Sequence, residues 1–217
     1  MLFRSGRFDL AYDGRSPPRM LEYNADTPTS VLEAAVAQWQ WLEDTGRPDQ
    51  FNSLHEKLIE RWRALGDQWP LGTTVHFSCL KDNEEDCISV EYLRDTAMQA
   101  GLSTRFVPIE DIGWNGLNFV DMEDRPVHTW FKLYPWEWIA AEHFATYLES
   151  AEVRYLEPPW KAILSNKGIL AILWELFPDH PNLLPAFFEP MPSSERQVAK
   201  PFHSREGANI RASGPEI

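Results

Sequence analysis

The sequence predicts a mixed α/β protein, and two patterns along the chain lead to this prediction. A strand–helix–strand unit runs from Thr73 to Val107, and a two-stranded hairpin precedes it at residues 7–24. The strand–helix–strand unit implies parallel strands joined by a right-handed crossover. It lacks the GxGxxG pattern, so a dinucleotide site of the Rossmann type is not supported.

The hairpin is predicted from alternation and from turn residues. Residues 7–12 and 19–24 each read as a strand with alternating faces. Asp13-Gly14 and Pro17-Pro18 lie between them, and such pairs mark turns. Two short strands around a turn predict an antiparallel pair.

The other elements follow from apolar spacing and from Gly and Pro breaks. In order, they are helices over 31–45 and 51–65, a strand over 73–79, a helix ending at Gly101, a strand over 104–107, a strand pair over 117–133, a helix over 137–149, a buried helix over 169–176 and a strand over 197–202. Pro158-Pro159 marks a natural boundary along the chain.

Composition restricts the classes of partner. Twenty basic and 33 acidic residues give a formal charge of -13. This field repels nucleic acid and anionic membrane surfaces, and it is compatible with a cationic substrate such as a polyamine. Acidity also serves solubility alone. No apolar run is long enough to span a bilayer, and Cys79 and Cys87 form no CxxC pair, which favours a reduced, cytoplasmic protein.

The first candidate site consists of Arg7, Asp9, Glu22 and Asn24. Side chains two apart on a strand share a face, so pairing of the two strands can bring all four together. Two carboxylates and an amide oxygen suit Mg²⁺, and an arginine suits phosphoryl oxygens. On pattern alone, a solvated hairpin face with incidental ion pairs is the favoured alternative.

Weaker candidates lie further along the chain. Thr27 stands near a predicted helix start, where backbone N–H groups bind anions or are simply capped. The acidic loop Glu84-Glu85-Asp86 suits a substrate ammonium group or the N-terminus of a helix. Lys167, Lys200 and the glycine-bearing loop 204–209 suit nucleotide phosphates, although a lone lysine is usually a surface residue.

Taken together, these segments resemble the synthetase region of the glutathionylspermidine synthase family. The matching runs, in order, are residues 7–9, 21–27, 85–86 with 90–93, 131–138, 166–168 with 173–178, and 200–201 with 205–210. Their order and number make the resemblance specific, and it covers essentially the whole chain from Arg7 onward.

The resemblance implies an ATP-grasp-like fold with a pre-ATP-grasp βαβ region. Residues 1–159 correspond to the substrate- and magnesium-binding region, and residues 160–217 to part of the nucleotide-binding region. The implied activity is an ATP- and Mg²⁺-dependent carboxylate–amine ligase that forms an amide by way of an acyl phosphate. The implied substrates are a glutathione-like peptide and a polyamine-like amine.

The resemblance also implies a role for particular residues. Arg7 corresponds to the arginine that contacts the transferring phosphoryl group, and it is the expected catalytic residue. The expected magnesium ligands are Asp9, Glu22 and Asn24; the expected ATP-binding residues are Arg7, Lys167, Lys200, Glu206 and Gly207; the expected substrate-binding residues are Thr27, Glu85 and Asp86. Acyl phosphate formation concentrates negative charge, so this set favours a magnesium site over the solvated face.

Departures from the family pattern add further expectations. Ser204 stands where many relatives have glycine. The ATP-grasp fold is expected to be incomplete, with the chain cut at both ends and with little or no ligase activity by itself. Two alternatives stay open: a ligase for another peptide and amine, and a non-catalytic nucleotide- or peptide-binding module that keeps the fold.

Overall fold

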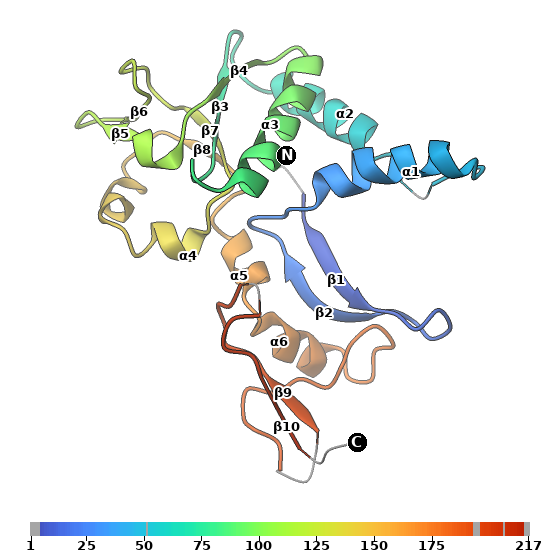
Figure 1. Cartoon of the computed structure of the whole chain (residues 1–217). Helices are drawn as coiled ribbons and strands as arrows, with labels where there is room; N and C mark the ends of the chain where they lie inside the picture. Colours follow the sequence, from blue (N-terminus) through green and yellow to red (C-terminus); the bar gives the residue numbers. More distant parts are fainter. Residues whose placement is uncertain (1–4, 51, 193–195, 206, 215–217) are drawn as a thin grey trace. The chain divides into compact units, whose positions relative to one another are not determined.

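The computed structural model describes residues 5–50, 52–192, 196–205 and 207–214 (Figure 1). The chain divides into two compact units. The first unit comprises Met1–Ser5 and Thr27–Pro159, and the second comprises Gly6–Asp26 and Trp160–Ile217. Each unit is described by itself.

The first unit is built on a parallel sheet of four strands in the order β4-β3-β7-β8. The strands are β3 (Thr74–Ser78), β4 (Ser103–Phe106), β7 (Thr129–Lys132) and β8 (Arg154–Leu156). Every residue of β7 is buried, as expected for a parallel strand covered on both faces.

Two helices, α2 (Leu54–Gly66) and α3 (Glu84–Gln99), pack against one face of this sheet (Figure 1). Their apolar side chains form a core with β3 and β7; its buried members are Leu58, Trp62, Leu65, Val75, Phe77, Cys79, Val90, Leu93, Ala97, Phe131, Leu133 and Leu156. The indole of Trp62 is fully buried and donates to Thr96 Oγ1 at 3.1 Å, which satisfies its polar atom.

A second core covers the other face of the sheet. It contains Val107, Ile112, Phe119, Val127 and Trp130. The paired short strands β5 (Gly113–Trp114) and β6 (Phe119–Val120) contribute to it.

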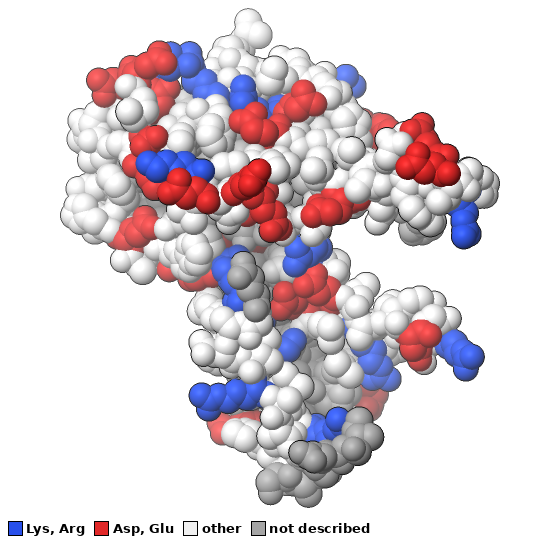
Figure 2. Space-filling view, in the orientation of Figure 1, with Lys and Arg blue, Asp and Glu red and all other residues white. Residues whose placement is uncertain are grey.

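Short helical segments complete the first unit. They are η1 (Glu33–Ala37), α1 (Gln38–Thr45), η2 (Ile109–Asp111), α4 (Trp136–Ile139) and η3 (His143–Tyr147). Acidic side chains form several separate patches on the face of this unit that Figure 2 shows, and basic side chains lie between them. In the described part of the chain, every helix is too short or too polar to cross a membrane.

The second unit combines a hairpin from residues 6–26 with residues 160–217. Antiparallel strands β1 (Arg7–Ala11) and β2 (Arg19–Asn24) are followed, much later, by α5 (Lys161–Ser165), α6 (Ile169–Leu176) and the antiparallel pair β9 (Gln197–Ala199) and β10 (Arg211–Ser213).

Hydrogen bonds fasten this hairpin to the later segments. Met20 donates its N–H to the Asn182 carbonyl at 2.8 Å, and the N–H groups of Ala25 and Asp26 both donate to Ser165 Oγ at 2.9 and 2.8 Å. The predicted split into residues 1–159 and 160–217 placed residues 6–26 in the first region. In the structure these residues belong with residues 160–217. The functional labels given to the two regions remain predictions.

The mixed α/β class with a parallel sheet is confirmed, and so are the hairpin and the strand–helix–strand unit. The strand pair over 117–133 is confirmed only close to its turn, where Val120 and Pro126 form an antiparallel bridge and the Val127 N–H donates to the Phe119 carbonyl at 2.8 Å. Beyond the turn the predicted pairing is wrong, because β6 pairs with β5, and β7 joins the main sheet beside β3. The wholly buried character of β7 explains this, since a hairpin strand would keep one face in water.

Two further expectations need correction. The helix over 137–149 is two short helical segments, α4 and η3. The helix over 169–176 exists, but it is not buried: Ile172 is 40% exposed and Leu176 is 64% exposed.

Candidate functional site

The hairpin of the second unit brings Arg7, Asp9, Glu22 and Asn24 onto one face. Arg7 lies directly opposite Asn24 in the strand register, and Asp9 lies opposite Glu22. Side chains of directly opposed residues share a face, and so do residues two apart on one strand. The structure therefore brings together the four residues that the sequence grouped.

Hydrogen bonds link these four side chains. Arg7 holds Asp9 with both ends of its guanidinium, at 2.8 Å from Nε to Oδ1 and 3.2 Å from Nη2 to Oδ2. Asn24 Nδ2 donates to Glu22 Oε1 at 3.2 Å and lies 3.5 Å from Asp9 Oδ2. The hydrogen bond from Arg7 is the largest influence on Asp9 and holds the pKa of that carboxyl below its usual value.

Lys167 joins the cluster from the turn between α5 and α6. Its Nζ lies 3.1 Å from Glu22 Oε2 and donates to the Ser204 carbonyl at 2.7 Å. The side chain is only 8% exposed. A lysine this buried and this well bonded has a fixed position, unlike an ordinary surface lysine.

Lys200 approaches the hairpin from the end of β9. Its Nζ donates to the Leu21 carbonyl at 3.0 Å. Burial lowers the pKa of Lys200, and the nearby positive charge of Lys167 lowers it further, while Glu22 and Asp9 act in the opposite direction. The site therefore holds Arg7, Lys167 and Lys200 around two carboxylates, an excess of positive charge that favours an anion.

The predicted loop after Lys200 is only partly described. Gly207 has a φ of +74°, a backbone conformation that suits glycine, and it lies in the turn before β10. Glu206 lies outside the described residues. Ser204 has a buried hydroxyl without a hydrogen-bond partner in the described part of the chain.

The donor set of the hairpin suits magnesium in kind. Hard oxygen ligands from two carboxylates and one amide are typical of Mg²⁺ sites, which often take few protein ligands and several waters. Among the described residues, no group of three or more His, Cys, Asp or Glu side chains is placed to hold a metal ion. The hairpin offers two acidic ligands, Asp9 and Glu22, so a Mg²⁺ site there also requires the amide oxygen of Asn24.

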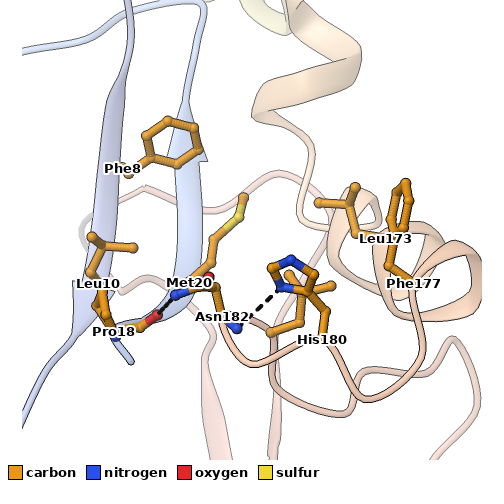
Figure 3. A pocket seen from close by; sticks show the side chains of 9 residues that line it. Phe8, Leu10, Pro18, Met20, Leu173, Phe177, His180 and Asn182 are labelled. Carbon is orange, nitrogen blue, oxygen red and sulfur yellow. Dashed lines mark hydrogen bonds between the residues drawn. The ribbon is translucent and has the colours of Figure 1, made fainter. Parts of the chain in front are cut away.

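The opposite face of the same hairpin is apolar. Phe8 and Leu10 from β1 and Met20 from β2 line a cavity of about 440 Å³ with Leu173 and Phe177 (Figure 3). Its other lining residues are Pro18, His180, Asn182 and Leu183. Alternation along β1 thus gives one charged face and one apolar face, and the cavity is separate from the charged cluster.

The predicted substrate residues lie in the first unit. Helical backbone begins at Val31, so Thr27 precedes the helix instead of capping it, because residues 28–30 intervene. Glu85 is exposed in the first turn of α3. Asp86 is half-buried, and its carboxylate accepts a hydrogen bond from Asn83 Nδ2 at 2.9 Å, so it also serves the helix end.

Sequence reasoning gave no role to Lys132 and Glu157, two buried charged residues at the carboxyl ends of β7 and β8. Lys132 donates to the Tyr134 carbonyl at 2.7 Å and lies over the ring of Trp136, 4.1 Å from its centroid. Glu157 accepts the Ser5 N–H at 3.2 Å. In open α/β sheets, ligands bind at the carboxyl ends of the strands, where Lys132 and Glu157 lie. Lys132 also belongs to the run 131–138, which resembles the family.

Comparison with known proteins identifies the family. The model of the family described as "Glutathionylspermidine synthase preATP-grasp" matches residues 3–216. The chain belongs to this family. The resemblance found in the sequence is confirmed, and the pre-ATP-grasp assignment agrees with the parallel sheet of the first unit.

Three curated relatives of this glutathionylspermidine synthase family member carry related names. A Haemophilus influenzae protein named "Putative acid–amine ligase" is 48% identical over 214 residues. Trypanothione synthetase of Crithidia fasciculata is 30% identical over 237 residues, and the bifunctional glutathionylspermidine synthetase/amidase of Escherichia coli is 29% identical over 233 residues.

These alignments cover 94–95% of this chain but only 54%, 36% and 37% of the three relatives, in the same order. The chain is thus related to acid–amine ligases and spans about half of their length or less.

Proposed function

We propose that this chain supplies the magnesium- and phosphate-binding part of an ATP-dependent ligase that joins a carboxylate to an amine. The observation that carries the proposal is the convergence of Arg7, Asp9, Glu22 and Asn24 on one hairpin face, with Lys167 bonded to Glu22. Residues distant in sequence meet there, and their chemistry is that of a site for Mg²⁺ and phosphate.

In this proposal the metal ligands are Asp9, Glu22 and Asn24. The Asn24 amide now directs its Nδ2 toward the two carboxylates. Turning the amide over presents its oxygen to a cation instead, and the two carboxylates then lose a donor and gain a cation. Bound Mg²⁺ supplies charge neutralisation for phosphate oxygens.

The cationic residues hold the nucleotide. Arg7 faces the transferring phosphoryl group, since its planar fork matches phosphate oxygens in pairs. Lys167 and Lys200 provide point charges to the remaining phosphate oxygens. Glu206 and Gly207 are the proposed loop residues of the phosphate site, and the positive φ of Gly207 suits a backbone whose N–H groups approach the phosphates.

The substrates in this proposal are a glutathione-like peptide and a polyamine-like amine, joined by way of an acyl phosphate. Thr27 binds on the peptide side, and Glu85 and Asp86 bind the amine. The names of the relatives support the substrate class, and the exposed carboxylate of Glu85 is open to a cationic ligand.

The experiment is magnesium-dependent binding of a fluorescent ATP analogue to the 217-residue chain. Glu22→Gln removes a ligand charge and the Lys167 ion pair, so we expect binding to weaken roughly tenfold or more, about 1.4 kcal/mol. Glu175→Gln, an exposed glutamate on α6 of the same unit, is the matched control and should bind like the unaltered chain.

Equal binding by the Glu22→Gln and Glu175→Gln variants, or binding that does not depend on Mg²⁺, contradicts the assignment. The Glu22→Gln substitution, made in a complete enzyme of the family, distinguishes a ligase from a non-catalytic binding module. A ligase loses amine-dependent ADP release, whereas a binding module has no such turnover to lose.

A further inference from the structure

The two cysteines of the chain lie against each other at the start of α3. Cys79 follows the last residue of β3, and Cys87 lies in the first turns of the helix. Their Sγ atoms are 3.2 Å apart. The segment between them contains the predicted amine-binding residues Glu85 and Asp86, but the chemistry below depends only on the two sulfur atoms.

The two thiols have different surroundings. Cys79 is fully buried in the core between β3 and α3, whereas Cys87 is half-buried near the surface. Burial raises the pKa of the Cys79 thiol well above its usual value, and the adjacent Cys87, Asp86 and Glu110 raise it further. Cys87 Sγ donates to the Leu80 carbonyl at 3.4 Å. Of the two, only Cys87 is open to a reagent from solution.

The local backbone keeps this arrangement in place. The N–H of Cys87 donates to the Asn83 carbonyl at 3.0 Å, and the Asn83 side chain accepts from the Asp86 N–H at 3.1 Å. Cys79 directly follows β3, and its carbonyl accepts from the Ile109 N–H at 3.0 Å. The two sulfur atoms therefore need little displacement to form a bond.

We propose that Cys79 and Cys87 form a redox-active thiol pair that a small-molecule disulfide oxidises to an intramolecular disulfide. The thiolate of Cys87 attacks one sulfur of the small disulfide, which forms a mixed disulfide and releases one small thiol. The sulfur of Cys79, after loss of its proton, attacks Cys87 Sγ, which forms the Cys79–Cys87 bond and releases the second small thiol.

The reaction balances in atoms, electrons and protons. Two protein thiols lose two electrons and two protons, and the small disulfide gains them as two thiols. The order of the steps follows from exposure: Cys87 is attacked from solution, and Cys79 resolves the mixed disulfide. The new bond ties the first turns of α3 to the end of β3 around Glu85 and Asp86.

The test treats the folded chain with oxidised glutathione, blocks remaining thiols with iodoacetamide and measures the intact mass. The unaltered chain is expected to lose about 2 Da and to resist alkylation at both cysteines, with a cross-linked peptide that joins residues 79 and 87. Dithiothreitol should restore two alkylatable thiols.

Two variants separate the steps. Cys79→Ser should stop at a glutathione adduct on Cys87, and Cys87→Ser should form no adduct while it stays folded, as judged by circular dichroism. The proposal is overturned if the unaltered chain keeps two free thiols under conditions that modify Cys87 in the Cys79→Ser variant. Absence of reaction in both proteins, or disulfides only between chains, overturns it as well.

Discussion

At the scale of the residue, Asp121 is a buried carboxylate surrounded by hydrogen-bond donors. Its side chain is 2% exposed, and it accepts from the N–H groups of Glu123 and Arg125 at 2.9 and 3.0 Å. Arg125 Nε adds a third bond at 2.8 Å. Burial raises the pKa of Asp121, but these donors outweigh burial and hold it at about 2.

This pKa predicts a defined loss of stability in acid. A carboxyl whose pKa is lower in the folded state stabilises the fold above its unfolded value of 3.8, and this contribution is lost as the pH falls toward about 2. We expect about 2 kcal/mol of unfolding free energy to disappear over that interval. Urea unfolding of the first unit between pH 5 and about 2 measures it.

Asp121→Asn should lack this component of the pH dependence and be destabilised at neutral pH. Asp124→Asn is the matched control, because Asp124 is exposed in the same turn and its φ of +57° suits asparagine. Identical pH profiles for the Asp121→Asn variant and the unaltered chain contradict the prediction.

At the scale of the element, α3 depends on the side chain of Asn83 at its N-terminus. Asn83 Oδ1 accepts from the Asp86 N–H at 3.1 Å, and Asn83 Nδ2 donates to the Asp86 carboxylate at 2.9 Å. Three acidic residues, Glu84, Glu85 and Asp86, occupy the first turn, where negative charge favours the helix dipole. The acidic run thus stabilises the helix whatever else it binds.

Removal of this cap should cost about 1 kcal/mol. We expect Asn83→Ala to lower the urea midpoint of the first unit without changing the slope of the transition. Asp82→Ala, at the exposed position just before the cap, should leave the midpoint unchanged. A similar loss of stability in both variants contradicts a capping role for Asn83.

At the scale of the whole molecule, the two units differ in how many apolar side chains they bury. Both apolar cores consist of residues of the first unit. Among the described residues of the second unit, the buried apolar side chains are Ala25, Ala171 and Leu183. Large side chains such as Phe187 and Phe188 are more than half exposed there, at 55% and 58%.

This distribution predicts different protection from hydrogen exchange. Amides of β3 and β7 should exchange slowly, because their opening requires loss of a buried sheet. Amides of the hairpin β1–β2 and of α6 should exchange faster, since few buried contacts hold them. Mass spectrometry of peptides from deuterated protein measures both sets, and equal protection in the two units contradicts the prediction.

The sequence predicted the hairpin, the strand–helix–strand unit and the hairpin face that gathers Arg7, Asp9, Glu22 and Asn24. These rest on alternation and on Gly and Pro breaks, which act over a few neighbouring residues. The sequence did not predict how β7 pairs, because a strand buried on both faces lacks the alternation of apolar and polar residues on which the prediction depended.

The sequence by itself determined the class of the fold, the family and the charged face of one hairpin, because short-range periodicity and residue type encode these. Only the tertiary structure decided that Lys167 bonds Glu22, that the hairpin belongs with residues 160–217, and that Cys79 and Cys87 meet. These contacts join side chains whose distances depend on how whole elements pack, and no local pattern fixes that packing.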